Sequence, residues 1–323
     1  MEKPKVSYAD FVASLPKKPQ RAAGTIAWIV QRYVDEMAAV KPVGTSQGYT
    51  LGIVQRMPIG AIQWLELAHT DVIDFARQRI DSGVCAATVM QGVTYLAGAL
   101  KYAGSAWKDC FGCSDTAVAT AKPFLKKHGL ISKSTPRDRQ PQDDEIERLR
   151  SYFRTPKSHG FDRRLPMELM MDWQLASGRR IGESCRLLWA DWDRENQTIL
   201  VRKMKDPKNR DKNKLVACTT EAQAMLVDLW EKRDPAEPRI FPVNAKSVGA
   251  AYTNAKNALG IVNLHLHDCR RRCITRLIQE KGYSSAETMC FSGHETPAVL
   301  ERTYLKMDPT KVKDGPRARQ VSA

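Results

Sequence analysis

The sequence predicts a mainly α protein with a small antiparallel β-sheet, arranged as a helical domain followed by a mixed α/β domain. Apolar residues recur at helical spacing through most of the chain, and two short runs alternate like paired strands. A polar stretch with two prolines separates the two regions. The length of 323 residues fits about two domains.

The first half of the chain is predicted to be helical. Residues 1–20 contain three prolines and little periodicity, so we expect an N-terminal arm. The spacing of apolar residues from 21 to 131 is mostly helical, and no segment there shows the alternation of a strand. The longest expected helix covers 86–103, and a shorter one is expected at 62–67. Residues 21–131 should therefore form one compact helical domain.

A linker and a mixed domain follow. Residues 132–142 are polar and charged, as linkers are, and the acidic run 143–147 suits a helix N-terminus. The second domain is expected at 143–312, before a basic tail at 313–323. Its expected elements are helices at 165–176, 181–188, 221–231, 246–259, 268–280 and 297–304, and strands at 198–201 and 215–218.

The charge of the chain indicates a polyanionic partner. Lysine and arginine number 51 and aspartate and glutamate 36, which gives a net charge of +15. Solubility alone usually needs a net charge of about 2 to 8. A larger positive excess favours binding to phosphates, because each neutralised phosphate releases condensed counterions. No apolar run approaches the roughly 18 residues of a membrane span, and no secretory signal opens the chain. We therefore expect a soluble, cytoplasmic protein that binds nucleic acid.

A glycine–arginine segment lies between two expected helices. Gly178 permits a tight turn, after which Arg180 stands at a helix start, where anions bind and an arginine can grip a phosphate. Glu183 lies three residues later on the same face and can hold the guanidinium. The segment taken alone is equally compatible with a surface Arg–Glu pair.

Two further segments carry chemistry. His267 and Arg270 are three residues apart on an expected helix and can face one group, although an isolated histidine is more often solvated or satisfied in a core. Tyr304 follows His294 by ten residues. A phenol has a pKa of about 10, so it becomes a nucleophile only beside cations that stabilise the phenolate. Alone, such a tyrosine is ordinarily a core or surface residue.

The order of these residues is more specific than any one of them. In chain order they are Arg180, Lys205, His267, Arg270, His294 and Tyr304. With this order and spacing the chain resembles the tyrosine recombinase (phage-type integrase) family. The segment 177–183 looks like the family's first arginine box, 266–271 like its second, and 292–304 like its closing histidine and nucleophile. The spacing between His294 and Tyr304 is one residue longer than in many relatives.

The resemblance implies a core DNA-binding domain at 21–131 and a catalytic domain at 143–312. Arg180 and Arg270 would hold the scissile phosphate, and Tyr304 would form a 3′-phosphotyrosine. The reaction would be site-specific cleavage and rejoining of duplex DNA, as in the integration, excision or inversion of a mobile element.

The remaining roles also follow from the resemblance. Lys205 would protonate the departing 5′ oxygen, His267 would assist proton transfer or activate the tyrosine, and His294 would hydrogen-bond the phosphate. Lys205 is chosen because it follows the strand at 199–203 most directly, where relatives place a lysine on a hairpin. The other lysines of this stretch remain candidates: Lys203, Lys208, Lys212 and Lys214.

The resemblance implies no cofactor, because the phosphotyrosine conserves the bond energy and the cationic groups replace a metal ion. Cys110 and Cys113 form a CxxC pair, but two further ligands at matching spacing are missing, so no metal site is expected. The implied partners are double-stranded DNA with specific recombination sites, a homotetramer that passes through a Holliday junction, and accessory DNA-bending proteins. The candidate DNA contacts outside the site are Thr88, Gln91, Lys101, Arg271 and Arg302.

Three other functions share part of this pattern. A type IB DNA topoisomerase shares the chemistry, but those enzymes usually lack the histidine that stands here at 267. A non-catalytic DNA-binding relative would not need the complete residue set. A basic RNA-binding domain is unsupported by any RRM, KH or zinc-knuckle signature.

Overall fold

The computed structural model describes residues 7–17, 19, 21–135, 137–155, 165–204 and 212–304. The chain divides into two compact units, Met1–Thr135 and Pro136–Ala323. The division falls within the expected linker at 132–142. Each unit buries a hydrophobic core of its own.

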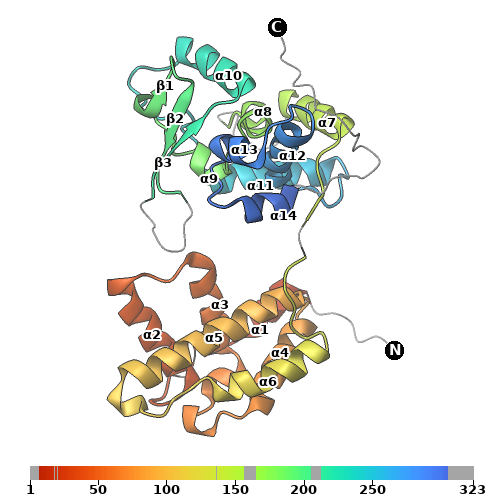
Figure 1. Cartoon of the computed structure of the whole chain (residues 1–323). Helices are drawn as coiled ribbons and strands as arrows, with labels where there is room; N and C mark the ends of the chain where they lie inside the picture. Colours follow the sequence, from red (N-terminus) through yellow and green to blue (C-terminus); the bar gives the residue numbers. More distant parts are fainter. Residues whose placement is uncertain are drawn as a thin grey trace. The chain divides into compact units, whose positions relative to one another are not determined.

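Unit 1 is built from helices (Figure 1). They are α1 (Tyr8–Ser14), α2 (Ile26–Val40), α3 (Thr45–Arg56), α4 (His69–Asp81), α5 (Ala86–Ala106) and α6 (Thr116–Lys127), with the 3-10 helices η1 (Pro58–Ala61), η2 (Trp64–Glu66) and η3 (Lys108–Cys110). The long helix α5 packs against α2, α3, α4 and α6. Its buried face is formed by Val89, Val93, Leu96 and Leu100, among others. Helix α5 therefore forms the centre of the unit 1 core.

Two parts of unit 1 differ from the sequence-based expectation. Residues 62–67 do not form an α-helix, because the Ile62 carbonyl accepts the N–H of Ile26 at 2.9 Å and ties the segment to the start of α2. Helix α3 was not predicted, since Gly48 and Gly52 lower its helix propensity. Packing against α2 and α5 stabilises it instead.

Unit 2 combines helices with a small sheet (Figure 1). Its helices are α7 (Asp143–Arg154), α8 (Met167–Ser177), α9 (Ile181–Ser184), η4 (Trp189–Asp191), α10 (Thr220–Glu231), α11 (Ala245–Ala258), α12 (Leu266–Gln279), α13 (Ser285–Ser292) and α14 (Pro297–Tyr304). Its strands are β1 (Trp192–Asp193), β2 (Thr198–Val201) and β3 (Lys214–Ala217), paired antiparallel in the order β1-β2-β3. The predicted fold class is confirmed. Within the described ranges, no helix has the length and apolar composition that crossing a bilayer requires.

Helices α8 and α12 form the centre of unit 2. Helix α12 packs against α8, α11, α13 and α14, and α13 also contacts β3. Leu300 of α14 is fully buried against Ile274 and Ile278 of α12. The segments that carry the candidate site residues thus gather around α12.

Helix α9 is shorter than the helix expected at 181–188. The chain leaves the helix after Ser184 because its next residues pair with a distant segment. The Leu187 carbonyl accepts the N–H of Ile240 at 2.9 Å, and Leu188 forms a β-bridge with Arg239. Only one helical turn therefore follows Arg180.

Candidate active site

Arg270 joins three segments that are far apart in the sequence. It lies on α12 and is fully buried. Its Nη1 donates to the Gly178 carbonyl at 2.5 Å, and its Nη2 donates to the Ser292 carbonyl at 3.1 Å. The same Nη2 lies 3.3 Å from Nε2 of His294. Arg270 and His294 therefore meet where α8, α12 and α13 converge.

Two glycines with left-handed backbones make this convergence possible. Gly178 has φ +59° at the end of α8, and Gly293 has φ +71° at the end of α13. A Cβ atom on Gly293 would lie 2.8 Å from Cε of Met204 and 3.2 Å from Nη1 of Arg179. Any larger residue would be strained in backbone and would push these neighbours apart.

His294 is buried beside Arg270, with 6% of its surface exposed. Its Nδ1 lies 2.7 Å from Oγ of Ser292. Because a guanidinium only donates, Nε2 of His294 accepts from Arg270 and the imidazole hydrogen is assigned to Nδ1. Burial, followed by the charges of Arg270 and Arg180, lowers the pKa of His294 to about 3. The ring is therefore neutral at pH 7.

Arg180 stands at the start of α9 and is held by Glu183. Nη1 of Arg180 donates to Oε1 of Glu183 at 2.7 Å, and the Arg180 peptide N–H donates to Oε2 at 3.2 Å. Burial by itself would raise the pKa of Glu183, but the charges of Arg179, Arg180 and Arg270 outweigh it and hold that pKa below its ordinary value. A charged, buried carboxylate thus fixes Arg180, whose side chain is about one-third exposed.

Arg179 is a buried cation that the sequence analysis did not single out. Its side chain is 1% exposed, and Nη1 and Nη2 have no hydrogen-bond partner among the described residues. Burial and the charge of Arg270 lower the pKa of Arg179 to about 10, so it remains charged at pH 7. Its position beside Arg180 in the sequence gave no sign of burial, because consecutive side chains leave a turn in different directions.

His267 lies in the first turn of α12, three residues before Arg270, and its side chain is exposed. Partial loss of hydration, followed by the charges of Arg270 and Arg180, lowers the pKa of His267 to about 4. At pH 7 it is therefore a neutral imidazole that solvent can reach and that can accept a proton.

The β2–β3 hairpin reaches the same region. Nζ of Lys214 donates to the His294 carbonyl at 3.0 Å, and Nζ of Lys212 donates to Oε2 of Glu295 at 2.6 Å. These contacts attach the end of the hairpin to the turn that follows α13. Lys205 lies outside the described residues, between β2 and β3 in the sequence.

Tyr304 is the last residue of α14. Its side chain and that of Arg302 lie outside the described part of the structure. The helix itself is fixed by Leu300, which is buried against α12 one turn before the tyrosine. Tyr304 therefore ends a helix that is anchored on the helix of His267 and Arg270.

The candidate DNA contacts outside this site differ in exposure. Gln91 and Lys101 are exposed on α5, where Lys101 pairs with Asp115 at 3.1 Å, and Thr88 is half-buried near the helix start. Arg271 is 6% exposed, because α12 is enclosed by four other helices. In this conformation Arg271 therefore offers little surface to DNA.

Comparisons with known proteins give matches along most of the chain. The model of the phage integrase family matches residues 142–311. The shufflon-specific DNA recombinase of Escherichia coli is 22% identical over 300 residues, which cover 90% of this chain and 72% of that protein. A putative integrase/recombinase of Haemophilus influenzae is 22% identical over 293 residues, which cover 88% of this chain and 73% of that protein.

Solved structures share the fold. The Tn1549 transposon integrase in complex with transposon right end DNA has a TM-score of 0.66 at 15% identity, covering 89% of this chain and 96% of that one. A lambda integrase tetramer bound to a Holliday junction has a TM-score of 0.64 at 14% identity, covering 86% of this chain and 77% of that one.

Proposed function

Because the chain belongs to the phage integrase family and is a tyrosine-type site-specific DNA recombinase, we propose that Tyr304 cleaves DNA at a phosphate held by Arg180 and Arg270. The observation that carries this proposal is the convergence at Arg270, where the ends of α8 and α13 meet α12 beside His294. The type IB topoisomerase and the non-catalytic relative are not favoured, since the matched proteins are named recombinases and integrases.

Attack by a tyrosine on a phosphodiester builds negative charge on the non-bridging oxygens and on the leaving oxygen. Arg180 is partly exposed and already oriented by Glu183, so it can bind a phosphate oxygen without reorganisation. Arg270 is buried beneath the turn at 292–294. Its contact with the phosphate therefore requires this turn to shift when DNA binds, and His294 would then donate a hydrogen bond to a phosphate oxygen.

Proton transfer is the second requirement. Neutral, exposed His267 is suited to accept the phenolic proton of Tyr304 or to relay it to solvent. Lys205, which lies between β2 and β3 in the sequence, would protonate the departing 5′ oxygen. The 3′-phosphotyrosine keeps the energy of the broken bond, so a 5′ hydroxyl can reverse the step and rejoin the strand without ATP.

We further propose that recombination takes place in a homotetramer on two specific duplex sites in the cytoplasm of a prokaryotic host, at the nucleoid. Accessory DNA-bending proteins would be additional partners. Support comes from the lambda integrase tetramer on a Holliday junction and from the bacterial sources of the relatives. Exposed Gln91 and Lys101 on α5 are the proposed groove contacts of unit 1.

The test is covalent trapping. A duplex with the recombination site and a nick beside the cleavage position loses a short fragment after attack, so the protein stays attached to DNA. The parental protein should give this adduct and Tyr304→Phe should not. The matched control is Tyr283→Phe, which removes a hydroxyl outside the site and should leave the adduct unchanged. An adduct that persists in Tyr304→Phe would refute the assignment.

A further inference from the structure

Helix α12, which carries His267 and Arg270, begins at a buried carboxylate. Asp268 is 2% exposed, and its Oδ2 accepts the peptide N–H of His265 at 2.9 Å. This bond caps the first turn of the helix. A buried carboxylate also needs a cationic partner, because burial removes the water that would otherwise solvate its charge.

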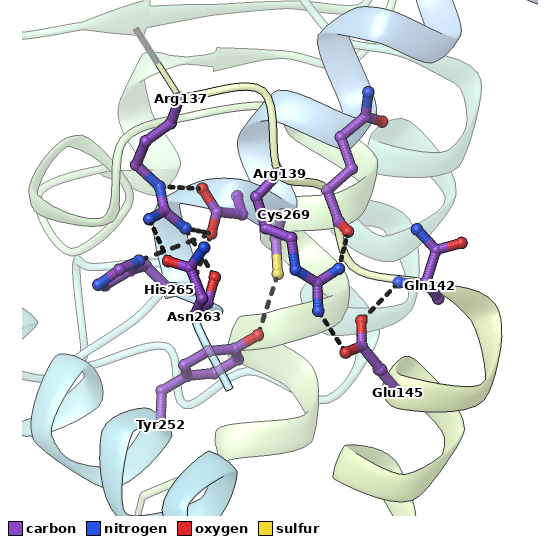
Figure 2. Close-up of polar contacts among 10 residues, drawn as sticks. Arg137, Arg139, Gln142, Glu145, Tyr252, Asn263, His265 and Cys269 are labelled. Carbon is purple, nitrogen blue, oxygen red and sulfur yellow. Dashed lines mark hydrogen bonds and ion pairs between the residues drawn. The ribbon is translucent and has the colours of Figure 1, made fainter. Parts of the chain in front are cut away.

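That partner comes from the linker. Nη2 of Arg137 donates to Oδ2 of Asp268 at 2.8 Å and to the Asn263 carbonyl at 2.8 Å, while Nη1 donates to Oδ1 of Asn263 at 2.6 Å. Figure 2 shows Arg137 beside Asn263 and His265. Because a guanidinium is a rigid fork, these bonds fix the linker and the start of α12 together.

The position of Arg137 in the chain gives this contact its significance. Unit 2 begins at Pro136, so Arg137 is the first residue of that unit that the structure describes, and its side chain binds the start of α12. The next linker arginine binds elsewhere. Arg139 donates to the Gln140 carbonyl and to Glu145 of α7 (Figure 2). Arg137 therefore binds the start of α12, whereas Arg139 binds α7.

We propose that Arg137 is a positioning residue for DNA cleavage, which acts through Asp268 to hold the first turn of α12. This inference rests on the proposed function. Asp268 directly follows His267 and lies two residues before Arg270, so a shift of its carboxylate displaces both side chains. Arg137 itself touches neither the phosphate nor the nucleophile. Through it, the path of the linker sets the geometry of the site.

The experiment separates cleavage from binding in the full-length protein. Single-turnover cleavage of the nicked substrate is measured at saturating protein, and the Kd is measured on an uncleavable duplex. Arg137→Ala should slow cleavage about 10- to 100-fold, as small misplacements of catalytic groups do, with the Kd nearly unchanged. Arg137→Lys should recover part of the rate, since it keeps one charge without the fork. The matched control Arg139→Ala should cleave at the parental rate.

A double substitution tests the route through Asp268. If Arg137 acts through this carboxylate, Arg137→Ala should cause no further loss in an Asp268→Asn background. Three results would each overturn the inference. They are a parental cleavage rate in Arg137→Ala, a loss of activity in Arg139→Ala as large as that in Arg137→Ala, and losses that add in the double variant. If Arg137→Ala does not fold, the cleavage rate of Arg137→Lys becomes the test. A parental rate in Arg137→Lys then counts against the proposal. Failure of the proposed function gives a different result. In that case the parental protein and Tyr304→Phe would not differ in the covalent adduct that they form with DNA.

Discussion

The Ser292 hydroxyl lies 2.7 Å from Nδ1 of His294, while the Ser292 carbonyl accepts a hydrogen bond from Arg270. One buried residue thus supports two residues of the candidate site. With Nε2 of His294 accepting from Arg270, the Ser292 hydroxyl accepts from Nδ1–H. When Nε2 of His294 has to donate to a phosphate oxygen, the hydroxyl can rotate and donate to Nδ1 instead. Ser292 therefore suits both tautomers of His294.

The first prediction concerns Ser292→Ala. This change removes the hydrogen bond between the Ser292 hydroxyl and Nδ1 of buried His294, at a cost of about 1–3 kcal/mol. We expect single-turnover cleavage to slow by about tenfold or more, with DNA affinity unchanged. The control is Thr288→Val on the same helix, because the Thr288 hydroxyl has no hydrogen-bond partner among the described residues. A parental cleavage rate in Ser292→Ala would contradict the assigned role.

The second prediction concerns stability below neutral pH. The pKa values of His294, about 3, and His267, about 4, lie below the ordinary value of 6.5 that the unfolded chain has. As pH falls below 6.5 the unfolded chain binds protons that the folded chain does not, so the free energy of unfolding decreases. The stability that the two neutral histidines contribute is fully present above pH 6.5. It is lost as the pH falls towards their folded-state pKa values of about 4 for His267 and about 3 for His294.

Urea unfolding at pH 7.5, 6.0 and 5.0 measures this effect. For His294 the decrease between pH 6.5 and 5 should be about 1–2 kcal/mol. His294→Gln removes the titrating group and should make the dependence shallower over this range. An unchanged slope in this variant would mean that His294 is not held neutral by its surroundings.

The helices of the site were largely predictable because each one carries a strong local pattern. Helices α12 and α14 were placed to within two residues, since their apolar positions recur at helical spacing. Helix α13 and strand β1 were missed. Strand β1 has only two residues and exists through pairing with β2, and the apolar residues of α13 show little one-sided spacing.

The non-local contacts of the site were not predictable from spacing. Glu183 could be assigned as the partner of Arg180 because residues three positions apart on a helix share a face. The carbonyls of Gly178 and Ser292, which hold Arg270, are backbone groups and leave no trace in a side-chain pattern. Arg137 and Asp268, 131 positions apart, meet only through folding of the whole unit.

The third prediction compares two glutamates that differ in burial. Glu183 is 2% exposed and lies among arginines, whereas Glu295 is 49% exposed and pairs with Lys212. Glu183→Gln removes the buried negative charge that lies among Arg179, Arg180 and Arg270, and it should cost about 3–5 kcal/mol. Glu295→Gln should cost less than about 1 kcal/mol, as exposed pairs do. Urea unfolding at pH 7 measures both, and equal losses would refute the argument from burial.

The fourth prediction identifies the general acid. An alkoxide leaves poorly without a proton, whereas a thiolate leaves readily because a thiol has a pKa of only about 8.5. Lys205→Ala should therefore slow cleavage of ordinary DNA by about 10²–10⁴-fold. DNA with sulfur in place of the bridging 5′ oxygen should be cleaved at nearly the parental rate by the same variant.

Two other lysines supply the controls for this experiment. Lys208→Ala changes a lysine of the same sequence segment between β2 and β3, and it should leave cleavage of both substrates unaffected. Lys214 has its Nζ bonded to the His294 carbonyl, so Lys214→Ala should slow both substrates alike by disturbing the histidine turn. Rescue by sulfur distinguishes loss of a proton donor from loss of geometry, because only the former is bypassed by a better leaving group. If the sulfur substrate restores cleavage by Lys214→Ala or by Lys208→Ala, and not by Lys205→Ala, then the lysine replaced in the restored variant is the general acid.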